Sequence, residues 1–243
     1  EASNGAVLIS QVEADSLGSS IVSSKKRIEF IGNSITAGMS SDLSGIPCDA
    51  GTWYDQHNAY DAYGPRVARA LDMDFMLSAY SGIGIYRNSQ ADSPVMRDIY
   101  TSAFLSPNPN SPRWDFNQFT PDIVSICLGT NDFSDGSGPA PRAPFDPLQF
   151  IPAYVDFINT VHGHYPDARI ILTNTPMLDS QKNIILMDCL QKIKSQAEAT
   201  ITGLKPIYIF SFSTEYHGGC MGHPSVEEQG KMAEEMVLFL KGI

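Results

Sequence analysis

Short runs rich in β-branched and aromatic residues alternate with longer runs of helical periodicity from residue 27 to the end of the chain. Five of the short runs are interpreted as strands: RIEFIG (27–32), DFMLSAY (74–80), DIVSICLG (122–129), ARIILTN (168–174) and KPIYIFSF (205–212). The helical runs are 60–71, 148–163, 183–200 and 226–241, the last opening with the capping-box pattern Ser225-x-x-Glu228. This alternation predicts an α/β fold in which helices cover both faces of a five-stranded parallel sheet.

Composition bounds the number of domains and the class of partner. A chain of 243 residues with 42% hydrophobic content can bury one substantial core, so one main domain is expected over 27–243. The 27 acidic and 16 basic residues give a net charge of -11, which argues against binding nucleic acid or an anionic membrane. No stretch is long and apolar enough to cross a bilayer.

The first 26 residues fit this domain poorly. AVLISQVEAD (6–15) is predicted to form one strand, and SLGSSIVSSKK (16–26) has the composition of a linker. The chain begins at Glu1 without the features of a signal peptide, so an export signal either was removed or never existed.

Candidate catalytic side chains follow the predicted strands. Ser34 comes after the first strand, Gly82 after the second and Asn131 after the third, while His223 lies near the C-terminus in GHPS. Because the carboxyl ends of parallel strands converge, these residues are expected to meet. Ser34 would be the nucleophile and His223 its base. The amides of Ser34 and Gly82 and the side chain of Asn131 would form an oxyanion hole, aided by a helix dipole at Ser34.

Each of these residues also has a structural interpretation when taken alone. Ser34 could cap a helix, Gly82 could serve a tight turn, and Asn131 with Asp132 could close an Asx turn. His223 could be a surface histidine. Their joint occurrence, in order, at the ends of strands of one sheet favours the catalytic interpretation.

Other polar and aromatic residues are weaker candidates. Two long segments rich in Pro, Gly, Ser and Asn, 106–121 and 134–147, flank the third strand and are of the kind that builds sites. The candidate substrate-binding residues are Trp53, Tyr54, Trp114 and Asp132, with His57 beside the first two; the loop aromatics would either stack on a sugar or pack on their own domain. The pair His162-x-His164 has no partner in metal-ligand spacing, so no metal site is predicted.

The four blocks around Ser34, Gly82, Asn131 and His223 resemble the signature of the SGNH (GDSL-type) hydrolases. RIEFIGNSITAG, NAYDAYGPRVARAL and SAYSGIGIYRN most resemble carbohydrate esterase family 2. The resemblance implies a three-layer α/β/α sandwich of the flavodoxin-like SGNH fold. It also implies a secreted or periplasmic serine esterase that needs no cofactor and removes acetyl groups from plant-type polysaccharides. That family usually carries a small β-sandwich domain upstream, of which residues 1–26 would be the final strand and linker.

Two positions depart from the superfamily pattern. Asn33 stands where an aspartate is usual in the first block. Cys220 stands three residues before His223, where an aspartate commonly orients the histidine. A thiol is a poor substitute for a carboxylate, so a Ser34–His223 dyad is predicted in which a backbone carbonyl, such as that of Met221, orients the ring.

The remaining cysteines and the alternative functions stay open. Cys127 lies in an apolar run and is expected to be a buried thiol, and at most one disulfide bond is expected among Cys48, Cys189 and Cys220. The alternative functions are a lipase-like or small-ester hydrolase of the same superfamily, and a carbohydrate-binding descendant that has lost catalysis.

Overall fold

The computed structural model describes residues 9–16, 18, 23–136 and 142–243. Within these ranges, no helix has the length and apolarity needed to cross a membrane. The predicted strand at 6–15 lies partly outside them. Residues 9–16 form no strand and are exposed, with Ile9 and Val12 uncovered, so that part of the prediction is not confirmed.

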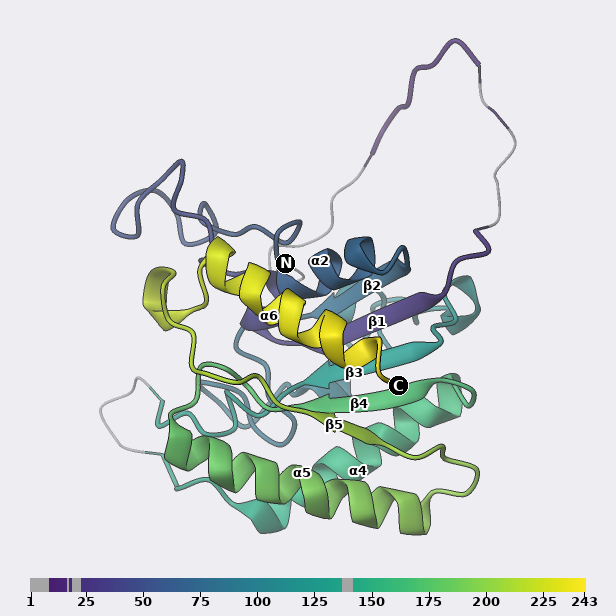
Figure 1. Ribbon diagram of the computed structural model, residues 1–243, viewed down its shortest axis with the longest axis vertical. Helices are drawn as coiled ribbons and strands as arrows, with labels where there is room; N and C mark the ends of the chain where they lie inside the picture. Colours follow the sequence, from purple (N-terminus) through teal and green to yellow (C-terminus); the bar gives the residue numbers. More distant parts are fainter. Residues whose placement is uncertain (1–8, 17, 19–22, 137–141) are drawn as a thin grey trace.

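A five-stranded parallel sheet forms the centre of the protein (Figure 1). Its strands are β1 (Arg27–Gly32), β2 (Asp74–Ala79), β3 (Ile123–Cys127), β4 (Arg169–Thr173) and β5 (Tyr208–Phe210). Their order across the sheet is β2-β1-β3-β4-β5, and every neighbouring pair is parallel. The predicted α/β class and all five strands are confirmed. The strand order places the ends of β2, β1 and β3 side by side.

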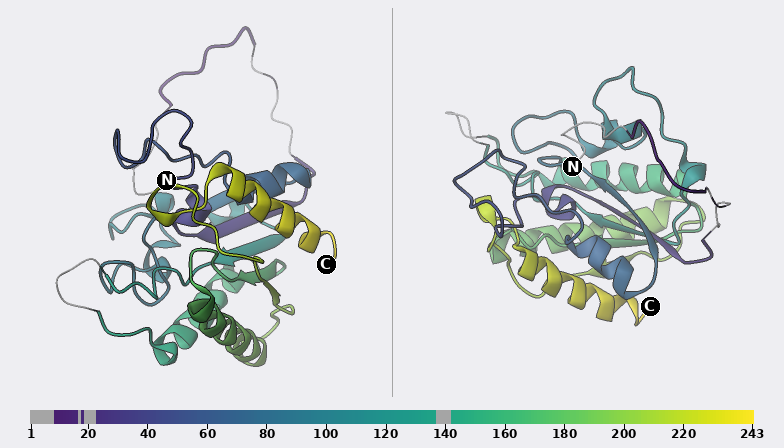
Figure 2. Two further views of the ribbon diagram at one scale, coloured as in Figure 1. Left: turned by 60° about the vertical axis from the view of Figure 1, so that its left-hand side comes forward. Right: turned by 90° about the horizontal axis from the view of Figure 1, so that it is seen from above.

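Six α-helices accompany the sheet within the described ranges. They are α1 (Ser34–Ala37), α2 (Tyr63–Ala70), α3 (Met96–Ile99), α4 (Pro147–His164), α5 (Ser180–Thr200) and α6 (Val226–Leu240). Helices α2 and α6 lie on one face of the sheet, and α4 and α5 lie on the other, which gives three layers (Figures 1 and 2). The helix expected to begin at Ser34 is present as the one-turn helix α1, whereas the one-turn helix α3 has no hydrophobic period and was not predicted.

Two hydrophobic clusters fill the spaces between the layers. Because side chains alternate along a strand, neighbouring residues of β1 serve opposite clusters: Phe30 packs with α2 and α6, and Ile31 packs with α4 and α5. Because both faces of the sheet are buried, the loops at the strand ends are where polar groups can meet a ligand.

Polar caps fix the starts of the long helices. The Asp146 side chain accepts the Leu148 N–H ahead of α4, and the Asp179 side chain accepts the Lys182 N–H ahead of α5. The capping box predicted at Ser225 and Glu228 is confirmed. Its N-cap, Ser225, lies two residues after His223, so α6 anchors the segment that carries this histidine.

Candidate active site

Ser34 occupies the first turn after β1. The strand ends at Gly32, the Asn33 side chain accepts the Ile35 N–H at 3.1 Å, and α1 begins at Ser34. Gly38 ends this helix at a φ of 69°, and a Cβ there would lie 2.3 Å from the Asn58 carbonyl oxygen. The helix expected at Ser34 is therefore one turn long, and its dipole is smaller than that of a helix of several turns.

Asn33, which replaces the usual aspartate, makes two contacts of opposite kind. Its Oδ1 caps α1, and its Nδ2 donates to Thr130 Oγ1 at 3.3 Å. Thr130 immediately precedes Asn131. The Asn33 amide supplies an acceptor for one contact and a donor for the other, whereas a carboxylate has no donor. These two contacts tie the end of β1 to the loop after β3.

His223 lies beside Ser34, with its Nε2 2.9 Å from Ser34 Oγ. Its Nδ1 lies 3.2 Å from the Cys220 carbonyl oxygen. A carbonyl can only accept, so it selects the tautomer that carries a proton on Nδ1 and leaves Nε2 free to take the Ser34 proton. The hydrogen-bonded carbonyl is that of Cys220, and the Met221 carbonyl, the example given by the sequence analysis, also acts on the ring.

Burial governs the charge of this histidine. His223 is 7% exposed, and desolvation of the imidazolium lowers its pKa below the ordinary value of 6.5, although carbonyls of the same turn act in the opposite direction. Because burial favours the uncharged ring, His223 is poised to act as a base at neutral pH.

Cys220 is not a free thiol. It forms a disulfide bond with Cys48, which lies 172 positions earlier in the sequence. Cys127 and Cys189 are free and buried, as expected for Cys127. The single bond is one of the three pairings that the sequence left open.

The two further oxyanion candidates lie on neighbouring loops. Gly82 follows β2 with a φ of 79°, a conformation that favours glycine. Asn131 follows β3, and its Nδ2 donates to the Ile83 carbonyl at 2.8 Å. A side-chain amide has two N–H groups, so this bond orients Asn131 beside the Gly82 loop and leaves one N–H for a ligand.

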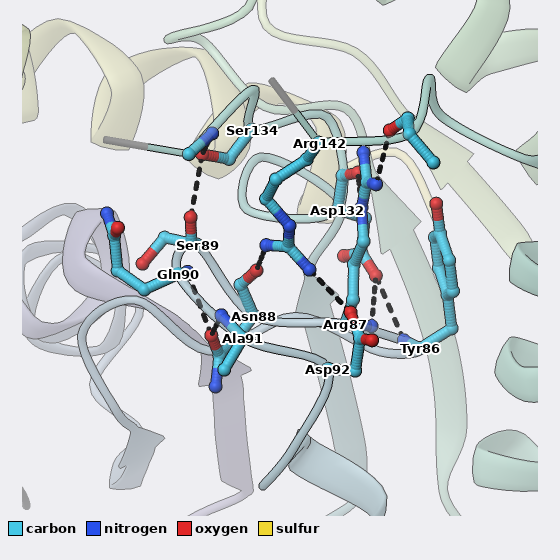
Figure 3. A network of polar contacts seen from close by, with 12 residues as sticks. Tyr86, Arg87, Asn88, Ser89, Gln90, Ala91, Asp92, Asp132, Ser134 and Arg142 are labelled. Carbon is cyan, nitrogen blue, oxygen red and sulfur yellow. Dashed lines mark hydrogen bonds and ion pairs between the residues drawn. The ribbon is translucent and has the colours of Figure 1, made fainter. Parts of the chain in front are cut away.

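Asp132 does not face a ligand. It is fully buried, and its carboxylate accepts the Ile85 N–H at 2.9 Å. It also accepts the N–H groups of Tyr86 and Arg87 at 2.9 and 3.3 Å (Figure 3). Burial raises the pKa of the Asp132 carboxyl to about 7, while these N–H donors act against that shift. The prediction that Asp132 binds substrate is therefore wrong for this arrangement, because the side chain is enclosed by the loop it holds.

Two arginines complete the connection between the loops after β2 and β3. Arg87 Nε donates to the Asp132 carbonyl at 2.7 Å. Arg142 reaches back to the Asn88 carbonyl and pairs with Asp92 at 2.6 Å (Figure 3). Sequence analysis missed this role, because no short-range pattern links Arg87 to Asp132.

The predicted aromatic residues separate into two places. Trp53 and Tyr54 are each about half exposed, at 46% and 47%, and Trp53 packs edge-on against His57 with the ring centroids 4.8 Å apart. His57 also acts electrostatically on His223, so these residues belong to the active-site side of the protein.

Trp114 lies elsewhere. It lines a separate cavity of about 140 Å³ with Glu29, Ser78 and Tyr100, and Glu29 is a fully buried residue of β1. Ser34 does not line this cavity. The structure therefore places Trp114 in this second cavity, and its role in substrate binding stays a prediction.

The histidine pair near the end of α4 makes ordinary contacts. His162 Nε2 lies 3.3 Å from the Thr202 carbonyl oxygen, and His164 stacks on Phe116. Among the residues that the structure describes, no group of three or more His, Cys, Asp or Glu side chains is arranged to hold a metal ion.

Comparison with known proteins gives one family match. Residues 30–200 match the model of the GDSL-like Lipase/Acylhydrolase family. That range contains Ser34, Gly82 and Asn131. His223 lies beyond the matched range, so its assignment rests on its distance from Ser34.

Three similar proteins are carbohydrate-active. The chain is 28% identical to an acetylxylan esterase / glucomannan deacetylase of Cellvibrio japonicus, covering 90% of this chain and 57% of that protein. It is 31% identical to the cellulase/esterase CelE of Acetivibrio thermocellus, covering 89% of this chain and 25% of that protein. A family two carbohydrate esterase of Clostridium thermocellum in complex with cellohexaose has a TM-score of 0.74 at 30% identity, covering 89% of this chain and 64% of that one. The chain thus spans little more than half, or less, of the two curated relatives.

Proposed function

Because the chain belongs to the GDSL-like lipase/acylhydrolase family, we propose that it is a serine esterase that removes O-acetyl groups from plant-type polysaccharides or oligosaccharides. The observation that carries this proposal is the 2.9 Å contact between Ser34 Oγ and His223 Nε2, with Nδ1 held by a carbonyl. Residues 27–243 would form the catalytic domain. Residues 1–26 would link it to an upstream β-sandwich domain like that of family 2 esterases.

The geometry supports a two-step acyl transfer. His223 takes the Ser34 proton as Ser34 Oγ attacks the acetyl carbonyl carbon. The resulting oxyanion is stabilised by the amides of Ser34 and Gly82 and by Asn131 Nδ2. As the tetrahedral intermediate collapses, the sugar oxygen leaves with the proton from His223, and Ser34 carries the acetyl group. A water molecule, deprotonated by His223, then releases acetate by the same path.

The relatives and the surface chemistry support a carbohydrate substrate. The similar proteins are named for acetylxylan and glucomannan, and one is seen with cellohexaose. Exposed Trp53 and Tyr54 provide rings on which a sugar can stack. A net charge of -11 suits a neutral glycan better than an anionic polymer. Such a substrate lies outside the cell, so we place the protein in a secreted or periplasmic location.

Acetate release from acetylated xylan, glucomannan and mannan tests this function. Acetyl esters should be cleaved with a kcat/KM far above that of octanoyl esters. Equal rates on both would favour the lipase-like alternative. Binding of the glycans without release of acetate, and without cleavage of 4-nitrophenyl acetate, would favour the non-catalytic alternative.

Activity should rise with pH through a midpoint below about 6.5, the ordinary histidine pKa. His223 must be uncharged to accept a proton, and burial lowers its pKa, so protonation inactivates the enzyme only in more acidic solution. Above that midpoint kcat/KM should stay level into mild alkali. The measurement is kcat/KM for 4-nitrophenyl acetate from pH 4.5 to 8.5, and a maximum on the acid side of the midpoint would contradict the role of His223.

A further inference from the structure

Cys220 is held by its side chain, its amide and its carbonyl at once. Its sulfur is bonded to Cys48, and its N–H donates to the Ser40 carbonyl at 2.8 Å. Its carbonyl accepts from the ring and from the main-chain N–H of His223, the latter at 3.1 Å. The residue that orients the base is therefore itself attached, by a covalent bond, to the loop that follows the nucleophile.

That loop, residues 39–58, connects the Ser34 turn to the segment before α2. Cys48 is exposed near its middle, and Cys220 is buried. Ser41 in the same loop accepts the Val226 N–H at 3.0 Å, at the start of α6. The loop thus contacts the chain on both sides of His223, and the disulfide bond is its one covalent link to that segment.

The turn that carries the orienting carbonyl has an unfavourable backbone. Met221 has a φ of 55° and Gly222 a φ of 71°, so two consecutive residues are left-handed. Met221 is also 74% exposed, so packing of its side chain does not compensate for this conformation. The disulfide bond at Cys220 reduces the number of other conformations that this turn can adopt.

We propose that the Cys48–Cys220 disulfide bond is a positioning device for the dyad, which keeps the Cys220 carbonyl against His223 Nδ1. This inference rests on the proposed function. At the position where related hydrolases place an aspartate, this chain provides a main-chain acceptor, and the side chain of the same residue holds that acceptor in place. Cys48 contributes through Cys220 and touches neither the substrate nor the reacting atoms.

Opening the bond should therefore misplace the ring without removing any group that reacts. Reduction by a dithiol converts the disulfide into two thiols while the dithiol becomes a disulfide, so two electrons and two protons pass to the protein. Misplacement of a catalytic group by about 1 Å costs up to about 100-fold in rate. We expect kcat to fall by about tenfold to 100-fold and KM for 4-nitrophenyl acetate to stay within about twofold.

The test compares the full chain in oxidised form, after reduction with dithiothreitol, and as Cys48→Ser. Cys48 is exposed and lies 172 positions before Cys220, so Cys48→Ser removes the disulfide bond without altering the Cys220 carbonyl. Both reduced protein and Cys48→Ser should lose kcat equally, and reoxidation should restore only the former. Dithiothreitol should not change Cys48→Ser further, which controls for effects of the reagent. Circular dichroism establishes that each sample is folded; if the variant does not fold, reduction of the folded protein remains the test.

Nitrogen-15 NMR of the His223 ring gives a readout that does not depend on turnover. Oxidised protein should show one tautomer, protonated on Nδ1, and opened protein should show a mixture. Full reduction, proved by the thiol count, with kcat and ring signals unchanged would overturn the inference. So would a loss of kcat that appears only when the protein unfolds. An oxidised protein that lacks esterase activity would refute the proposed function, and the ring signals would still decide the positioning.

Discussion

Ser34→Ala and His223→Ala are each expected to lower kcat by about 10³-fold or more, and the double variant should be little worse than either. The two side chains form one unit through the 2.9 Å contact of Oγ with Nε2, and neither half transfers the acetyl group alone. The measurement is kcat and KM for 4-nitrophenyl acetate and for acetylated xylan in all four proteins, with folding checked by circular dichroism.

Matched controls exist on the surface of the same chain. Ser195 on α5 is exposed, with its Oγ donating to the Gln191 carbonyl, and His162 near the end of α4 contacts the Thr202 carbonyl. Ser195→Ala and His162→Ala should therefore retain kcat. Additive losses in the double variant, or a Ser34→Ala protein that keeps most of its activity, would rule out the dyad.

Asn131→Ala is expected to lower kcat by about 10² to 10³ and to leave KM nearly unchanged. The charge that Asn131 Nδ2 would stabilise exists mainly in the transition state, so its loss should not weaken binding of the ground state. Asn131→Asp provides a stricter comparison because it keeps the shape but replaces both donors with acceptors and a negative charge. It should be at least as inactive as Asn131→Ala.

Asn131 also donates to the Ile83 carbonyl, so its replacement by alanine removes a contact within the protein as well as the proposed oxyanion donor. The two effects can be distinguished. If loosening of the loop after β2 were the main cause, thermal unfolding would shift and KM would rise. Exposed Asn110 offers a control in which neither quantity should change. A variant in which KM rises while kcat is retained would instead assign Asn131 to substrate binding.

The arrangement of elements could be predicted because parallel strands are buried on both faces. Such strands appear as continuous β-branched runs, and β1 was located to the residue, while the ends of β5 were placed two or three residues too far out. β5 lies at the edge of the sheet, where few residues are buried on both faces, so its ends were predicted less accurately. A strand was expected over 6–15, and its described part, residues 9–15, is irregular and pairs with none of the five strands.

The residues of the dyad were also visible in the sequence. Ser34, Gly82 and Asn131 each follow a recognisable strand, and the geometry of any parallel sheet brings such positions to one edge. His223 was identified from its motif, GHPS. The start of α6 at Val226 then fixes the segment that carries His223 beside Ser34. The sequence by itself therefore determined the class of fold, the edge of the sheet at which the candidate site forms and the side chains proposed to react.

Only the tertiary structure decided how those side chains are held. The pairing of Cys48 with Cys220 joins positions 172 apart, and the Cys220 carbonyl meets the His223 ring in a turn where Met221 is left-handed. Asp132 was expected to bind substrate and is enclosed by three backbone N–H groups, and Trp114 lies in another cavity. These contacts join residues far apart in the chain, and their partners are chosen by packing and burial, which leave no periodic pattern in a single sequence.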